Sequence, residues 1–327
     1  MRRNSMVLAL SLMAAACGGP GSTTGNVDTK AVGIYATLGS NKVLVFAPDA
    51  VGNATPVRVI AGPHTGLSLP LGMAVDSLGQ LYVANRLGAS VTVYARGATG
   101  DATPIRTLTA TGMGSPEALA IGPADDLFVS TCPGCGQSAG GQTAIFHFPT
   151  QGLQSDYQLG GPTNSQLTYP GSIALDGSKN LIVANAFGGK VLTFAPGASG
   201  DTLPIRSFSP GGNVQSVAFG NSSILLGMPG AGIQLYPASA GPGTPAASTI
   251  PPSATFQLQY PAGIFLDTSV TTPVLYVNDY GGTSIWIVKT QGTAPNLTAL
   301  STTSISGAST GLSAPLGLLV VTDGTQH

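Results

Sequence analysis

Short apolar runs recur along the chain, each introduced by a turn residue and closed by an acid or a glycine. The most complete copies occupy residues 70–76, 170–176 and 261–267, and each is followed by a second and a third apolar run. Runs of four to six consecutive apolar residues are typical of strands that are covered on both faces. A repeat of about 45 to 50 residues built from such strands predicts the blades of a β-propeller.

Weaker copies of the first run bring the expected number of blades to six. They lie at residues 116–121, 214–219 and 315–321. The last copy is too close to the end of the chain to begin a new blade, whereas the first strands, at 33–36, 43–46 and 56–60, lack an innermost partner. We therefore predict an all-β fold, a six-bladed β-propeller whose C-terminal strand completes the N-terminal blade and leaves no open edge in the ring.

Two other repeated features have structural interpretations. Five of the six third runs end in an aromatic residue, which we interpret as packing between blades: Phe46, Tyr94, Phe148, Phe194 and Tyr236. Three of the fourth strands are preceded by a Gly-Asx-x-x-Pro-x-Arg refrain, at residues 52–58, 100–106 and 200–206. Proline is tolerated at the start or the edge of a strand, so the fourth strands are expected outermost. The arginines of the refrain are expected to be solvated charges at the rim: Arg58, Arg106 and Arg206.

Composition agrees with a turn-rich β protein. The chain has 46 Gly and 25 Pro, and only 8% of its residues are charged. One propeller over residues 32–327 absorbs nearly all of the length. A net charge of -1 provides no basic patch, which argues against a nucleic acid as partner. The sequence shows no phosphate loop and no cofactor fingerprint, so we expect no cofactor, and we expect a monomer.

The N-terminus has the features of an export signal. Arg2 and Arg3 precede an apolar segment at residues 6–16, which is too short to span a bilayer and ends in small residues before Cys17. A cysteine in this position resembles a bacterial lipobox, which implies a signal peptide over 1–16, a lipid on the Cys17 thiol and a tether over 17–31. No aspartate follows Cys17, which by the same resemblance implies the outer membrane. An ordinary secretory signal is the alternative.

The blade pattern resembles the NHL-repeat family. The resemblance rests on the Pro-x-Gly-Met-Ala-Val-Asp start at 70–76 and on the Leu-Tyr-Val-Ala-Asn strand at 81–85, with their counterparts in other blades. It extends over residues 32–321 and is poor in the fifth blade, where 237–255 is rich in Pro, Ala, Ser and Gly. The family implies a disc with a central channel but no single function, because propellers include enzymes as well as binding modules.

Four polar residues are expected at one mouth of this channel. The starts of the first strands and the ends of the second strands share a face of the disc; Glu117, the only glutamate in the chain, lies at such a start, and Asn85, Asn185 and Asp279 lie at such ends. An oxygen-rich cluster of this kind suits a hard divalent cation, and it is similar to the metal site of propeller lactonases of the regucalcin type. Alternatively, the amides and Asp279 close turns, and the carboxylate of Glu117 is solvated.

Histidines and cysteines add little chemistry. His147, inside an apolar run, is interpreted as a buried histidine with satisfied hydrogen bonds, and His64 lies in a loop without a second histidine at ligand spacing. Cys132 and Cys135 form a C-x-x-C motif, which we interpret as a disulfide in an oxidising compartment, with reactive thiols as the alternative.

The sequence therefore predicts a propeller on a lipid anchor in the cell envelope that acts as a binding or scaffold module for an unknown protein or small molecule. A metal-dependent hydrolase of the lactonase type is the alternative function.

Overall fold

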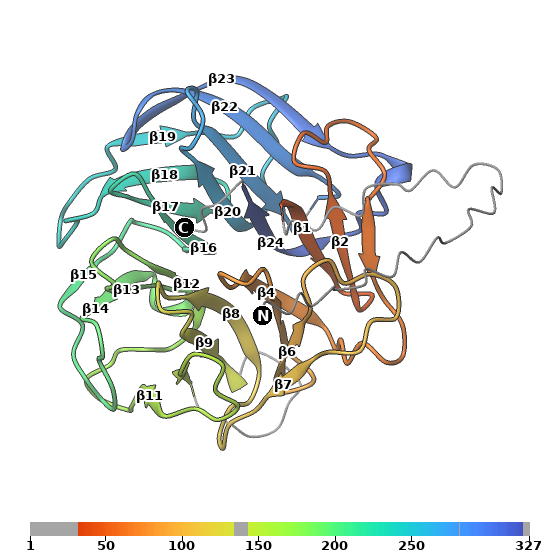
Figure 1. Ribbon diagram of the computed structural model, residues 1–327. Helices are drawn as coiled ribbons and strands as arrows, with labels where there is room; N and C mark the ends of the chain where they lie inside the picture. The colour runs from red at the N-terminus through yellow and green to blue at the C-terminus, as the bar shows by residue number, and fades with distance from the viewer. Residues whose placement is uncertain (1–31, 134–142, 281, 323–327) are drawn as a thin grey trace, which may run out of the picture.

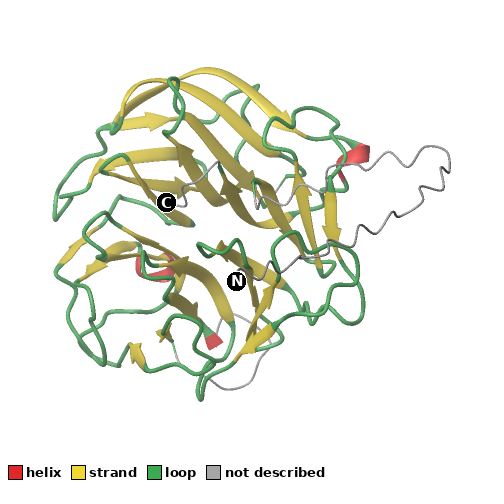
Figure 2. Ribbon diagram, in the orientation of Figure 1, coloured by secondary structure: helices red, strands yellow, loops and turns green. Residues whose placement is uncertain are grey.

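A computed structural model describes residues 32–133, 143–280 and 282–322, and these residues form six four-stranded antiparallel sheets arranged as blades around a central axis (Figure 1). Strands and loops make up almost all of the described chain (Figure 2). None of the described helices is long and apolar enough to cross a bilayer. The all-β, six-bladed propeller predicted from the repeat is confirmed.

Each blade runs from an inner to an outer strand. Blades 1 to 3 comprise β24 (Pro315–Val321), β1 (Gly33–Leu38), β2 (Lys42–Phe46) and β3 (Arg58–Ile60); β4 (Pro70–Val75), β5 (Leu81–Asn85), β6 (Ser90–Tyr94) and β7 (Arg106–Leu108); and β8 (Pro116–Ile121), β9 (Leu127–Thr131), β10 (Ala144–Phe148) and β11 (Tyr157–Leu159). Blades 4 to 6 comprise β12 (Pro170–Leu175), β13 (Leu181–Asn185), β14 (Lys190–Phe194) and β15 (Arg206–Phe208); β16 (Ser216–Gly220), β17 (Ser223–Met228), β18 (Gly232–Pro237) and β19 (Ser248–Ile250); and β20 (Pro261–Asp267), β21 (Val274–Asp279), β22 (Ile285–Thr293) and β23 (Asn296–Ile305). The helical turns are η2 (Ala186–Gly188) and η3 (Ala308–Thr310).

The ring closes through the two ends of the propeller. Strand β24 pairs antiparallel with β1 from Gly33↔Val321 to Leu38↔Pro315, with an irregularity near Thr37. Figure 1 shows the blue β24 beside the red β1 at the centre of the disc. The predicted completion of the N-terminal blade by the C-terminal strand is therefore confirmed.

The core lies between blades. Each of six buried clusters within the described residues combines apolar side chains of two neighbouring sheets. The aromatic ends of the third strands belong to these clusters; Tyr94 of blade 2, for example, packs in one cluster with Val43 and Val45 of blade 1. All five are buried: Phe46, Tyr94, Phe148, Phe194 and Tyr236. Their interpretation as packing residues is confirmed.

The arginines of the refrain are not simply solvated, and that expectation is wrong. They reach back across their own blade: Arg58, Arg106 and Arg206. The first two donate hydrogen bonds from Nη2 to Tyr35 Oη (3.0 Å) and Tyr82 Oη (2.6 Å) and lie over those rings. Blade 4 has Ile182 in the place of the tyrosine, and there the arginine lies 3.8 Å from Asp176. A planar guanidinium favours such aromatic and carboxylate partners over water.

The Gly-Asx pair of the refrain links a blade to the one before it. Gly100 forms a parallel bridge with Ile60, donating its N–H to Val59 O (2.6 Å), and Asp101 accepts the main-chain N–H of His64 (2.8 Å). The same arrangement recurs where Asp201 holds the loop at residues 163–165. The Gly-Asx pair of the refrain therefore links neighbouring blades through main-chain hydrogen bonds, in addition to preceding the outer strand.

We expect Asp201→Ala to lower the melting temperature at pH 7, because three main-chain N–H groups, of Thr163, Asn164 and Ser165, lose their acceptor. These hydrogen bonds hold the pKa of Asp201 below its ordinary value. The carboxylate therefore contributes stability above its unfolded pKa, and this contribution is lost as the pH falls through the folded pKa. Thermal melts of variant and wild type should converge in strong acid, and the exposed Asp49→Ala should leave the melting temperature unchanged at either pH.

Candidate functional site

The first strands of all six blades line a central channel with a cavity volume of about 1490 Å³. Six equivalent positions at the start of these strands ring one mouth of the channel: Leu71, Glu117, Gly171, Gln215, Ala262 and Leu316. Glu117 is the one ionisable residue of this ring. Three further side chains line the channel: Arg86 follows the end of β5, Tyr169 precedes the start of β12 and Tyr280 follows the end of β21.

Glu117 is buried against Arg86, and the expectation of a solvated carboxylate is wrong. Its side chain is 4% exposed, whereas that of Arg86, which directly follows β5, is 18% exposed. Arg86 Nε lies 3.0 Å from Glu117 Oε1, but the N–H direction falls outside hydrogen-bond geometry, so the contact is an ion pair only. The backbone of blade 2 approaches this strand closely, since a Cβ at Gly72 would lie 2.7 Å from the main-chain oxygen of Glu117.

Burial raises the pKa of Glu117 to about 7, and the positive charge of Arg86 opposes the rise without cancelling it. Tyr169 completes the group: its pKa is raised, chiefly by burial and next by the charge of Glu117, and its side chain is hydrogen bonded to Arg86. We call Arg86, Glu117 and Tyr169 the mouth triad. Its net charge falls from +1 toward zero as the pH rises through about 7, because Glu117 ionises in that range.

The other predicted mouth residues have a different role. Asn85, Asn185 and Asp279 are almost fully buried, and they do not belong to the described lining of the channel. Each side-chain oxygen accepts main-chain N–H bonds from the loop that enters the first strand of its own blade. The donors include Ser68 (3.1 Å), Thr168 (2.9 Å) and Tyr260 (2.6 Å). The structure thus places Glu117 at the channel, whereas the other three side chains hold the loop before the first strand of their own blade and do not close a tight turn of their own backbone.

A cation already occupies the space beside the Glu117 carboxylate, because the Arg86 guanidinium lies against it. A metal ion bound to the same oxygens would be repelled by that charge. Among the residues that the structure describes, no group of three or more His, Cys, Asp and Glu side chains could hold a metal ion.

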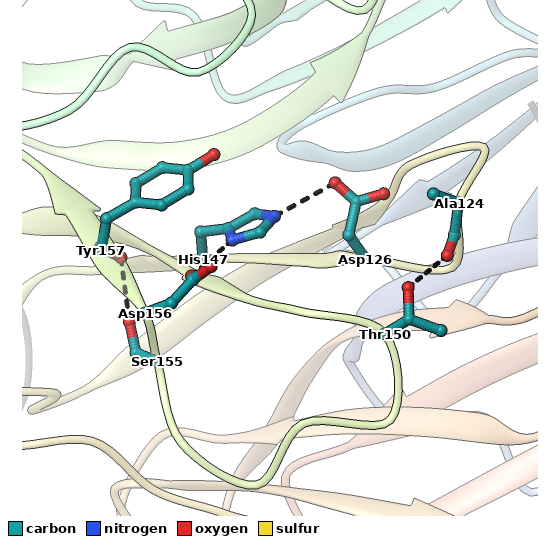
Figure 3. A network of polar contacts seen from close by, with 7 residues as sticks. All are labelled: Ala124, Asp126, His147, Thr150, Ser155, Asp156 and Tyr157. Atoms are coloured by element: carbon teal, nitrogen blue, oxygen red, sulfur yellow. Dashed lines mark hydrogen bonds and ion pairs between the residues drawn. The ribbon is translucent and has the colours of Figure 1, made fainter.

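His147 lies away from the channel, in a polar network of blade 3 (Figure 3). Its Nδ1 is 2.6 Å from Asp156 Oδ1 and its Nε2 is 3.1 Å from Asp126 Oδ2. The ring stacks on Tyr157 with 4.3 Å between centroids. Both ring nitrogens therefore have carboxylate partners, and the interpretation of His147 as a buried, satisfied histidine is confirmed.

Of the three cysteines, Cys132 lies within the described residues, where it is buried and takes part in a disulfide. Cys17 and Cys135 lie outside them. Lipidation of Cys17 and the pairing of Cys132 with Cys135 therefore remain predictions.

Sequence reasoning missed Arg86 and Tyr169. Both adjoin positions that the repeat did identify, since Arg86 follows Asn85 and Tyr169 precedes Pro170. Their equivalents vary from blade to blade, so the repeat itself carries no signal for them. The one available signal was the single glutamate itself, which has no cation next to it in the sequence. If its carboxylate is buried, it needs a cation nearby in the fold.

Comparison with known proteins identifies the fold alone. Known protein families give no match to the chain, and neither do curated protein sequences. Solved structures do resemble it, among them the crystal structure of a protein of unknown function from Bacteroides caccae. The alignment has a TM-score of 0.56 and 12% sequence identity, and it covers 88% of this chain and 98% of that chain. At that identity the likeness supports the propeller architecture that the sheets themselves display.

Proposed function

We propose that this protein is a lipid-anchored binding module of the bacterial envelope, with a propeller of NHL-like blades whose ligand site is the channel mouth at the mouth triad. The observation that carries the proposal is the buried pair of Glu117 and Arg86. Glu117 Oε1 is buried and accepts no hydrogen bond within the described structure. An incompletely satisfied charged group at the entrance of a large cavity is typical of a site that completes its contacts with a ligand.

The pair is not needed to build a blade. Five other blades start their first strand with a neutral residue at the same position: Leu71, Gly171, Gln215, Ala262 and Leu316. A buried ion pair stabilises a fold little compared with well-packed apolar side chains, because both charges lose their hydration. A role in ligand binding therefore explains the presence of Glu117 better than a role in the stability of the blade.

The surroundings of the triad define the ligand that it favours. The guanidinium of Arg86 and the hydroxyl of Tyr169 can donate hydrogen bonds, while Glu117 Oε1 can accept one. Gln215, in the same ring, adds an amide, and the wall behind it is formed largely by apolar side chains of the first strands. This combination suits a polar group at the mouth with an apolar part directed into the channel, and it favours binding over catalysis.

A ligand screen tests the site. We expect one or more members of a panel of neutral sugars, carboxylates, amines and short peptides to raise the melting temperature saturably, by mass action. Glu117→Gln and Tyr169→Phe should reduce that shift. Lys179→Gln, which alters an exposed residue at the other end of the channel, should preserve it. If every ligand that stabilises the wild type stabilises Glu117→Gln equally, the mouth triad is not the binding site.

The proposed anchor rests on Arg2, Arg3 and the small residues before Cys17. We expect Cys17→Ala to move the protein from the membrane to the soluble fraction, because it removes the thiol that would carry the acyl chains. Ser22→Ala, in the adjacent tether, should remain in the membrane fraction, and in a density gradient the wild type should follow the outer membrane. A Cys17→Ala variant that stays membrane-bound, with a wild type that incorporates no labelled fatty acid, would contradict the proposal.

A further inference from the structure

The most exposed aromatic side chains of the protein lie at the channel mouth. Among the aromatic side chains whose burial the structure describes, two are largely exposed, Tyr260 at 50% and Tyr280 at 48%. Tyr260 precedes β20 and Tyr280 follows β21, so both lie on the face of the disc where the first strands begin. Tyr280 also lines the channel. Exposed tyrosines beside a cavity are typical of a binding site, because they combine a large apolar face with a hydroxyl group.

We call Tyr260 and Tyr280 the tyrosine pair. Their ring centroids are 6.5 Å apart, and the ring planes meet at 77°. Hydrogen bonds hold the main chain of both residues, since Tyr280 donates its N–H to Tyr260 O (2.9 Å) and Tyr260 donates its N–H to Oδ1 of the buried Asp279 (2.6 Å). The two rings are therefore presented at a nearly right angle from a fixed main chain, and a flat apolar surface can pack on one of them.

The tyrosine pair lies across the channel from the mouth triad. Strand β8, which carries Glu117, packs against β4 and β12, whereas β20 packs against β16 and β24. The six first strands form one ring in this order, so that blades 3 and 6 are opposite each other (Figure 1). A ligand at the mouth therefore has polar and charged groups on one side and aromatic rings on the other.

The mouth triad favours an uncharged ligand with several hydroxyl groups. Arg86 Nε lies 3.0 Å from Glu117 Oε1, so an anion bound there meets a like charge in the ionised Glu117, and a cation meets one in Arg86. A hydroxyl group both donates and accepts hydrogen bonds, so two hydroxyls on neighbouring carbons can serve the carboxylate and the guanidinium together. The N–H and C=O of a trans peptide unit point in opposite directions, which makes a peptide a poorer match.

We propose that the ligand of the channel mouth is an uncharged sugar, whose hydroxyls bind the mouth triad and whose C–H face packs on Tyr280. This inference rests on the function proposed above and names the chemical class of its ligand. The C–H groups of a pyranose ring carry a slight positive charge and the face of an aromatic ring is negative, so the two attract each other. An apolar group attached to the sugar enters the channel along the apolar wall of the first strands.

An array of immobilised uncharged glycans, with sialylated and uronic acid glycans beside them, tests the ligand class. The probe is the full chain, purified in a detergent without a sugar headgroup. We expect binding to one or more uncharged glycans. Glu117→Gln should raise the dissociation constant at least about tenfold, because the sugar loses a hydrogen bond to a charged group. Tyr280→Ala should raise it several-fold, whereas Tyr280→Phe, which keeps the ring, should bind as the wild type does.

The control is Leu203→Ala, which shortens an exposed side chain before the outer strand of blade 4 and should leave binding unchanged. Thermal melts report whether each variant is folded. Calorimetry with the methyl and octyl glycosides of the best sugar distinguishes two sources of that sugar. Tighter binding of the octyl glycoside identifies the headgroup of a glycolipid, and equal binding identifies a free glycan.

Failure of the sugar proposal is distinguishable from failure of the binding site itself. If carboxylates, amines or peptides stabilise the protein through Glu117 while no uncharged glycan binds, the site at the mouth triad stands and the sugar class is wrong. Binding of sialylated or uronic acid glycans alone also overturns the uncharged class. If an uncharged glycan binds equally to the wild type, Glu117→Gln and Tyr280→Ala, the sugar lies elsewhere on the protein and both proposals fail.

Discussion

Deletion of residues 312–327 is expected to abolish cooperative folding. The deletion removes β24, which supplies the innermost strand of blade 1 and pairs with β1 along its whole length. Val320 and Val321, both buried, leave two of the clusters between blades. The edge of β1 is then exposed at the centre of the disc, where the ring is open. The loss should exceed the roughly 5 kcal/mol that marks an exceptional point mutation, out of a total of about 5–15 kcal/mol for a domain.

Thermal and urea unfolding of the truncated protein measure this loss. The matched control is deletion of residues 323–327, which follow β24 and should leave the transition in place. Circular permutation that joins the two ends of the propeller and reopens the chain in another loop should also preserve the transition, because the ring stays closed. A protein without 312–327 that melts cooperatively within a few degrees of the full chain would show that closure contributes little.

Arg86→Met is expected to lower the free energy of unfolding by about 3–5 kcal/mol at pH 8, because it leaves the buried carboxylate of Glu117 without its cation. The loss should be much smaller at pH 5. In the folded wild type the pKa of Glu117 is about 7, above the ordinary value of 4.5, so the folded state binds the extra proton between these values. Stability from this group is therefore highest below pH 4.5 and falls as the pH rises toward 7. Without Arg86 the fall should continue above pH 7.

Urea unfolding at a series of pH values provides the measurement. The double variant Arg86→Met with Glu117→Gln should recover most of the loss at pH 8, since a neutral amide needs no cation. Glu117→Gln alone should flatten the pH dependence between pH 5 and 8. Equal destabilisation by Arg86→Met at pH 5 and pH 8 would mean that its alkyl packing, rather than its charge, holds the site together.

The mouth triad could be predicted from the sequence only in part. Glu117 was placed at the mouth because strand direction repeats from blade to blade, which makes the start of each first strand a fixed position in the ring. Its partners could not be found in this way, because Arg86 belongs to blade 2 and Tyr169 adjoins blade 4. Asn85 shared the predicted face with Glu117, yet its short side chain bonds to a loop of its own blade.

The sequence by itself determined the number of blades, the strand order and the closure of the ring. These properties follow from the spacing of the apolar runs along the chain. They follow also from the incomplete sets of strands at its two ends, which together make one blade. Tertiary structure alone decided which groups meet between blades: the ion pair of Glu117 with Arg86, and the hydrogen bonds from the loop at residues 163–165 to Asp201. The physical reason is that these contacts depend on the angle and spacing of neighbouring sheets, which determine how deeply each side chain is buried and which partner it meets. The sequence repeat reflects only the packing that every blade shares.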